Sequence, residues 1–206
     1  MSLNEYFDEI YLINVDTDVE RLAQATEEFE KINTTFQRVS GIVYGGAHTK
    51  FARLAGCYLS HTTIMRMAIA HGHTRILICE DDVMFHPDIV NDIPKIVQED
   101  YDILWFQGMK TTCPEDGPFI RSSGPRHQTH CFSINNKIPA VLEHMEKHFS
   151  FDLLLSPDQV FFNHPHPTIH HCTTCKYYAV QREGRSNILG RDIKRFSGTI
   201  EEWRGE

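Results

Sequence analysis

Apolar and polar positions change their spacing twice in the first part of the chain. Residues 10–15 form a nearly continuous apolar run, and residues 17–31 repeat apolar side chains every three or four positions. The first pattern predicts a strand and the second an amphipathic helix. Thr17 followed by Glu20 matches a capping box, so we expect this helix to begin at Thr17.

The next segments predict a second helix and a buried strand. Residues 54–70 have the helical pattern, and Gly72 suits a left-handed C-cap. Residues 75–79 follow with apolar side chains and no alternation, as in a central parallel strand that is covered on both faces. The sequence then changes abruptly to three consecutive acids, Glu80, Asp81 and Asp82.

The rest of the chain continues the alternation of strands and helices. We expect helices at 87–98 and 137–148, strands at 102–106, 129–134 and 176–181, and a long irregular loop at 108–126 that is rich in proline and glycine. This order predicts an α/β fold, with a largely parallel sheet flanked by helices. We find no internal repeat or linker, so residues 1–206 are expected to form one domain.

Length, charge and cysteine content exclude several classes of protein. The chain has 206 residues and a net charge of −8, which argues against broad binding to nucleic acid or anionic membranes. No apolar run is long enough to span a membrane, and Asn4, Glu5 and Asp8 interrupt any signal-peptide core. We therefore expect a cytoplasmic protein whose six cysteines are buried thiols or metal ligands rather than a disulfide framework.

The three acids lie where α/β sheets usually bind ligands, beyond the carboxyl end of a buried strand. In extended chain the side chains of Glu80 and Asp82 would point to the same side and Asp81 to the other, so Glu80 and Asp82 could share one cation. Clustered carboxylates favour a hard cation such as Mn²⁺ or Mg²⁺. The alternative is that these acids only solvate a turn or cap the next helix.

Several motifs in one order resemble glycosyltransferase family 25, which includes lipopolysaccharide-type and procollagen galactosyltransferases. The motifs are Ile10-Tyr11-Leu12-Ile13-Asn14-Val15-Asp16, Gly56-Cys57-Tyr58-Leu59-Ser60-His61, Ile76-Leu77-Ile78-Cys79-Glu80-Asp81-Asp82-Val83, Cys131-Phe132-Ser133-Ile134, Ser156-Pro157-Asp158 and Ser186-Asn187-Ile188. The resemblance covers about residues 9–190. It implies a GT-A-like fold and transfer of a hexose, galactose or glucose, from a UDP-sugar to a hydroxyl of a carbohydrate or hydroxylated acceptor.

The resemblance also implies roles for individual residues. Glu80 and Asp82 match the metal-binding acidic motif, with Asp81 inside it. Asn14, Asp16 and Arg21 match the part of the family that contacts the nucleotide, and Gln181 and Ser186 lie in its later motifs. Apart from the resemblance, His61 beside Ser60 could touch the sugar nucleotide, and the alternative is a structural histidine. Arg182 and Arg185 flank Gly184 and could close over the diphosphate, and the alternative is a solvated basic turn. Two positions depart from the family, Thr17 in place of a basic residue and Asn187 in place of an acid, and the second puts a metal or acid role at that position in doubt.

Asp158 is the candidate general base. Family 25 enzymes transfer with inversion, which requires a carboxylate to take the proton of the acceptor hydroxyl. Asp158 matches an acid of the family and stands among apolar or neutral residues, where desolvation would raise its pKa. The alternative is an acid in the first turn of a helix that begins at Ser156-Pro157.

A segment rich in histidine and cysteine, residues 164–175, lies outside the family pattern. Cys172 and Cys175 with neighbouring histidines are ligand types for Zn²⁺, but one such pair supplies too few ligands for a structural site, and a polar loop is the alternative.

The interpretation as a metal-dependent glycosyltransferase has two rivals. One is a non-catalytic domain of the same fold that binds a glycan or a protein. The other is a Mg²⁺-dependent phosphotransferase, which the absence of a P-loop pattern disfavours. A membrane-bound glycolipid acceptor could bring the enzyme to a membrane surface, and the sequence does not give the oligomeric state.

Overall fold

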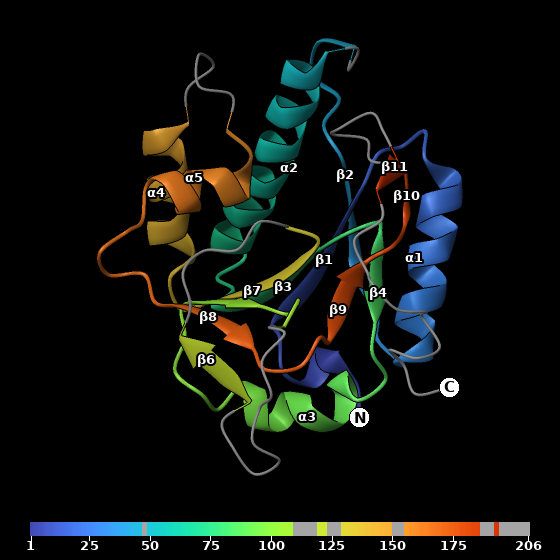
Figure 1. Cartoon of the computed structure of the whole chain (residues 1–206), viewed down its shortest axis with the longest axis vertical. Coiled ribbons are helices and arrows are strands. Elements are labelled where there is room, and N and C mark those ends of the chain that lie inside the picture. Colours follow the sequence, from blue (N-terminus) through green and yellow to red (C-terminus); the bar gives the residue numbers. More distant parts are fainter. Residues whose placement is uncertain (47–48, 109–118, 123–128, 150–154, 186–191, 194–206) are drawn as a thin grey trace.

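A computed structural model describes residues 1–46, 49–108, 119–122, 129–149, 155–185 and 192–193 (Figure 1). The helices are α1 (Val19–Lys31), α2 (Lys50–Ala70), α3 (Ile89–Ile96), α4 (Ile138–His148) and α5 (Pro157–Asn163), with 3-10 turns η1 (Leu3–Glu5) and η2 (Tyr44–Gly46). The strands are β1 (Glu9–Asn14), β2 (Gln37–Ser40), β3 (Arg75–Glu80), β4 (Val83–Phe85), β5 (Ile103–Trp105), β6 (Ile120–Ser122), β7 (Cys131–Asn135), β8 (His171–Thr174), β9 (Ala179–Gln181), β10 (Gly184–Arg185) and β11 (Asp192–Ile193).

Seven of these strands form one mixed sheet in the order β2-β1-β3-β7-β5-β8-β6. Strands β2, β1 and β3 are parallel to one another, and β5 is parallel to β8. Strand β7 runs antiparallel to both of its neighbours, β3 and β5, and β6 runs antiparallel to β8. The predicted fold class, a largely parallel sheet flanked by helices, is confirmed.

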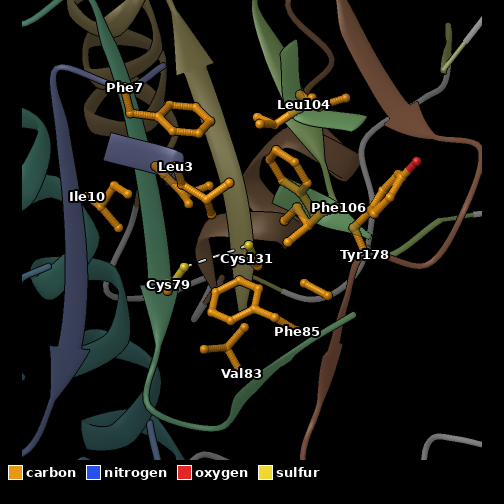
Figure 2. Packing of buried hydrophobic residues seen from close by; sticks show 14 of the residues in the cluster. Leu3, Phe7, Ile10, Cys79, Val83, Phe85, Leu104, Phe106, Cys131 and Tyr178 are labelled. Atoms are coloured by element: carbon orange, nitrogen blue, oxygen red, sulfur yellow. Dashed lines mark hydrogen bonds between the residues drawn. The ribbon is translucent and has the colours of Figure 1, made fainter. Parts of the chain in front are cut away.

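The central strands of the sheet supply side chains to two separate cores. Along β3, Leu77 and Cys79 pack toward α1 and α3, whereas Ile76 and Ile78 pack toward α2, α4 and α5. Figure 2 shows the first of these cores, in which Cys79 of β3 faces Cys131 of β7. Burial on both faces explains why residues 75–79 have no polar alternation.

The start of α1 differs from the sequence prediction. Its N-cap is Asp18, whose side chain makes no capping hydrogen bond, and the helix begins at Val19, so the capping box at Thr17 is wrong. The backbone N–H of Asp18 donates to the carbonyl of Val15 at 2.9 Å, and the Asn14 side chain donates to the carbonyl of Asp18 at 3.0 Å. These bonds close a turn over residues 15–18 and delay the helix.

The second half of the chain contains strands that the sequence did not predict. Strand β6 lies within the expected loop at 108–126, of which residues 109–118 and 123–126 lie outside the described residues. Strand β8 lies in the histidine-rich segment and pairs with β5 and β6. None of the helices in the described part of the chain is long and apolar enough to cross a membrane.

Candidate functional site

The three acids occupy the tight connection between β3 and β4, which we call the acidic turn (Glu80, Asp81 and Asp82). Strand β1 lies beside β3 and ends at Asn14, so polar groups from both strands meet at their carboxyl ends. Strand β9 pairs with β4 and places Gln181 opposite Val83. The end of β1, the turn between β3 and β4, and the end of β9 therefore lie next to one another.

Glu80 lies on the α2 side of the sheet. Its Oε1 is 3.0 Å from His61 Nε2 and accepts a hydrogen bond from the Thr129 hydroxyl, and the Cys57 thiol lies 4.0 Å away. Burial alone would raise the pKa of Glu80, but the partners His61 and Thr129 outweigh it and lower the pKa to about 2. Glu80 is therefore a fixed anion at neutral pH.

Asp81 lies on the opposite side, toward α1. Its carboxylate accepts a hydrogen bond of 2.8 Å from Asn14 Nδ2 and forms an ion pair with Arg21. Burial raises the pKa of Asp81 to about 6, although Arg21 and Asn14 act in the other direction. The charge of this carboxylate thus depends on the guanidinium that α1 supplies.

Asp82 shares the same arginine. Arg21 approaches Asp82 Oδ2 at 2.9 Å, and Gln181 Nε2 donates to that oxygen at 2.7 Å. Two buried oxygens of this pair, Asp82 Oδ1 and Gln181 Oε1, have no hydrogen-bond partner among the described residues. Orphaned buried oxygens on adjacent side chains are unfavourable by themselves and suit a cation.

The expectation that Glu80 and Asp82 point to the same side is wrong. Alternation along β3 carries Glu80 to the α2 face and Asp81 to the α1 face, but the strand ends at Glu80. The turn that follows directs Asp82 to Arg21, the partner of Asp81. All three acids still act on Arg21, since their charges raise its pKa against the effect of burial.

Asp16 lies at the rim of this group. It pairs with Arg38 and accepts a hydrogen bond of 2.8 Å from the Ser40 hydroxyl. Arg38 also donates from Nε to Asn14 Oδ1 at 3.1 Å, so Asp16 connects to the acidic turn through two intermediates. The predicted contact between Asp16 and a nucleotide stays a prediction.

Asp158 lies in the first turn of α5, as the structural alternative for this residue expected, and Ser156 donates a hydrogen bond to it. Burial, then Glu80 and then Asp158 raise the pKa of the Cys57 thiol. Helix α5 packs against α2, which carries Cys57 and His61, and the role of general base stays a prediction.

The predicted residues after β9 are only partly described. The side chain of Arg185 and all of Ser186 lie outside the described residues. Arg182 points toward α1, where its guanidinium lies 3.4 Å from the carbonyl of Gln24 and 3.6 Å from Glu28.

The two cysteines considered as zinc ligands, Cys172 and Cys175, have different environments. Cys172 is buried in β8 with its thiol 3.7 Å from the carbonyl of Asp100, and Cys175 is disulfide-bonded. A disulfide sulfur is not the thiolate that zinc prefers. Cys175 also corrects the expectation that all six cysteines are thiols or ligands, and zinc binding at this pair has no support in the geometry.

The sequence did not identify three partners of the site. Thr129 and Cys57 contact Glu80, and Arg38 contacts Asn14. Cys57 stands in a motif quoted for the family, one helical turn before His61, so its proximity to His61 could have been deduced from the periodicity of α2. Thr129 and Arg38 come from other elements, and no local pattern points to them.

Comparison with known proteins finds one matching family model. Residues 52–123, about a third of the chain, match the family model described as glycosyltransferase family 25 (LPS biosynthesis protein). Residues 52–123 are thus similar to glycosyltransferase family 25. They include most of α2, all of β3 and the acidic turn, and this match confirms the predicted resemblance.

One solved structure agrees in fold. A glycosyltransferase involved in the glycosylation of the major capsid of PBCV-1 has a TM-score of 0.52 at 10% identity, with 87% of this chain and 94% of that chain covered. The glycosyltransferase GlyE of Streptococcus pneumoniae TIGR4 is less similar, with a TM-score of 0.38 at 15% identity and with 80% of this chain and 37% of that chain covered. A comparison with curated proteins finds no match. The match of residues 52–123 to family 25 supports the predicted classification as a glycosyltransferase.

Proposed function

We propose that this glycosyltransferase is metal-dependent and transfers a hexose, galactose or glucose, from a UDP-sugar to a hydroxyl of a carbohydrate or hydroxylated acceptor. The observation that supports this most is the pair of orphaned buried oxygens, Asp82 Oδ1 and Gln181 Oε1, beside two further carboxylates. A nucleotide diphosphate is an anion, and a protein of net charge −8 needs a local device to hold it.

The donor set fits a hard divalent cation. Asp82 and Gln181 offer the oxygen ligands that Mn²⁺ and Mg²⁺ prefer, whereas Glu80, the other predicted ligand, faces the α2 side and would have to turn from His61 and Thr129 to join them. Such a cation would supply charge neutralisation for the departing diphosphate. Arg21 now balances Asp81 and Asp82, so it would release at least Asp82 when the cation binds and could then face the diphosphate itself.

Other residues would hold the donor in place. Asn14 is buried and holds Asp81, and we propose that Asn14 and Asp16 line the nucleotide side with Arg38 between them. His61 is fully buried against Glu80 and Phe132, which makes it a positioning residue for Glu80 rather than a direct donor contact. Arg185 and Ser186 remain candidates for closing over the diphosphate.

Asp158 is proposed as the general base. The acceptor hydroxyl oxygen would attack the anomeric carbon of the hexose while its proton passes to the Asp158 carboxylate. The bond between that carbon and the diphosphate oxygen breaks with inversion, and UDP leaves with the electron pair. The packing of α5, which carries Asp158, against α2, which carries Cys57 and His61, supports this role.

The metal proposal is tested by calorimetry of UDP binding with and without Mn²⁺. We expect binding only with Mn²⁺ in the wild type and its loss in Asp82→Asn, because that change removes one charged ligand. Asp88→Asn is the matched control, since Asp88 pairs with Lys176 away from the acidic turn. Equal UDP affinity in Asp82→Asn and Asp88→Asn would refute the assignment.

The base proposal needs a different measurement, because donor binding should survive. Asp158→Asn should lower turnover by at least about 100-fold while UDP affinity is unchanged. Turnover close to wild type would remove Asp158 from this role. Binding of glycan without any binding of UDP and Mn²⁺ would favour the non-catalytic alternative instead.

A further inference from the structure

Helix α2 and the end of β3 bring three metal-ligating side chains together on one face of the sheet. They are Cys57, His61 and Glu80, which we call the α2 triad. Cys57 and His61 are four residues apart on α2, so they lie on one face of the helix, and that face meets the end of β3 (Figure 1). Asp82 and Gln181, whose orphaned oxygens support the proposed Mn²⁺ site, are not members of the triad.

The ligand atoms of the α2 triad are close enough to share one cation. His61 Nε2 is 3.0 Å and Cys57 Sγ is 4.0 Å from Glu80 Oε1, and the three ligand atoms all lie within 4.8 Å of one another. The sulfur, nitrogen and oxygen ligands of a tetrahedral zinc ion lie about 3.4 to 3.6 Å from one another. Small movements of the side chains would therefore bring all three atoms to coordination distance.

Two of the three ligands are already held in place. His61 is fully buried and stacks on Phe132, with ring centroids 5.6 Å apart. Glu80 accepts a hydrogen bond from the Thr129 hydroxyl, a partner of the kind that orients a coordinating carboxylate. When His61 Nε2 binds a cation, the ring hydrogen moves to Nδ1, which has no hydrogen-bond partner among the described residues. Only the hydrogen bond between His61 and Glu80 is then exchanged for coordination.

The charge around Cys57 favours a cation. Burial, and then the charges of Glu80 and Asp158, raise the pKa of its thiol. Negative charges that oppose a thiolate favour a cation, and a coordinated thiol loses its proton to solvent as the bond between sulfur and metal forms. Cys57 and Glu80 both keep partial exposure to solvent, so a cation can enter and retain a water molecule as its fourth ligand.

We propose that the α2 triad binds a thiophilic divalent cation of the zinc type through Cys57 Sγ, His61 Nε2 and Glu80 Oε1. Thiolate and imidazole ligands select zinc over Mg²⁺ and Mn²⁺, which prefer oxygen ligands. The cation would tie α2 to the end of β3 and hold Glu80 on the α2 face, so that Glu80 could not turn toward Asp82. The proposal does not depend on the proposed function, whose cation would lie beside Asp82 and Gln181.

The experiment is a titration of the untagged full chain with Co²⁺, which replaces zinc and gives a charge-transfer absorption band when a thiolate coordinates it. We expect a saturable band in the wild type and none in Cys57→Ser, because serine supplies no thiolate. Cys172→Ser is the matched control, since the Cys172 thiol also lies near a histidine, 3.6 Å from His170 Nε2. Asp82→Asn is a second control, because it removes an oxygen ligand outside the triad. Both controls should keep the band.

Competition for Zn²⁺ with a chromogenic chelator gives a second readout. Cys57→Ser and His61→Gln should each bind Zn²⁺ at least about tenfold more weakly than the wild type, and both controls should bind like the wild type. Circular dichroism without metal checks that each variant is folded, and His61→Gln tests the site even where Cys57→Ser does not fold. No thiolate band in the wild type, a band retained in folded Cys57→Ser, or loss of the band in Cys172→Ser or Asp82→Asn instead would overturn the proposal.

Discussion

Three consecutive carboxylates of this chain have three different environments. Glu80 is fixed as an anion by His61 and Thr129, whereas burial raises the pKa of Asp81 to about 6. Asp82 keeps one oxygen without a hydrogen-bond partner. The sequence alone places these acids at the end of β3. Their partners come from other elements, such as His61 from α2 and Arg21 from α1.

Gly56 is a residue whose role depends on close approach of the backbone. A Cβ at this position would lie 2.2 Å from the carbonyl oxygen of Ile42, and Ser60 accepts a hydrogen bond of 2.8 Å from the Ile42 N–H. Gly56→Ala should therefore lower the free energy of unfolding by about 1 to 3 kcal/mol, because backbone must move. Urea denaturation measures this, with Thr63→Ala on the same helix as control; equal stability of the two variants would show that residues 41–43 move freely.

The partners of the site show what sequence reasoning can and cannot supply. Asn14, Glu80, Asp81 and Asp82 were predicted because strand ends and acidic runs are local signals. Arg21 and Gln181 were predicted only through the family resemblance, since no local pattern brings α1 and β9 to the turn. Thr129 was not predicted, because its hydrogen bond to Glu80 spans 49 positions of the chain.

At the scale of elements, long periodic segments were predicted well. Helices α1, α2 and α4 and strands β1, β3 and β7 lie within a few residues of their predicted bounds. Short strands were missed, because β6 and β8 have three and four residues and lack a distinctive pattern. The polar composition of β8 is compatible with a strand because β5 and β6 pair with its backbone on both edges and the hydroxyls of Thr173 and Thr174 donate to the carbonyl of Trp105.

Helix α2 begins with a side-chain cap whose contribution to stability can be measured. Thr49 is the N-cap, and its hydroxyl accepts a hydrogen bond of 3.1 Å from the N–H of Ala52. Thr49→Ala should lower the free energy of unfolding by about 1 kcal/mol, because that N–H loses its partner. Thr49→Asn keeps a capping oxygen and should be nearly neutral. Thermal or urea unfolding of both variants compares them, and an equal loss in both would argue against the cap.

At the scale of the whole molecule, the order of strands could not be read from the sequence. Two strands, β7 inside the sheet and β6 at its edge, run antiparallel to their neighbours, and β7 separates the parallel strands β2, β1 and β3 from the parallel pair β5 and β8. The pairing of β7 with β3 joins residues more than 50 positions apart, and pairing over such distances leaves no periodic trace. The sequence therefore predicted the fold class, an α/β sheet flanked by helices, but not the order of its strands.

Acid stability should depend on His171, a histidine buried in β8, next to the edge strand β6. Its Nδ1 accepts a hydrogen bond of 3.4 Å from Trp105 Nε1, and burial lowers its pKa to about 4. The unfolded chain protonates this group near pH 6.5 and the folded chain only near pH 4, so stability should fall as pH drops through this window, by up to about 3 kcal/mol. The raised pKa of Asp81 acts in the opposite direction, so the difference between two variants is the proper measurement.

That measurement compares urea unfolding of the wild type and His171→Phe between pH 7 and pH 4. The variant cannot titrate at this position, so its stability should fall less steeply with acid even if it starts lower. His73→Ala serves as control because His73 is only half-buried. Parallel slopes for wild type and His171→Phe would contradict the prediction.

Two thiols in the middle of the sheet have a practical consequence. Cys79 of β3 and Cys131 of β7 lie directly opposite each other with their sulfurs 3.7 Å apart, and both are fully buried (Figure 2). Burial raises the pKa of Cys79 well above that of a free thiol, so it should be inert to alkylation while the strands are paired. The rate at which mass spectrometry finds these two sulfurs alkylated should therefore rise with the fraction of molecules whose sheet centre is open to solvent, and should reach the opening rate itself at high reagent concentration.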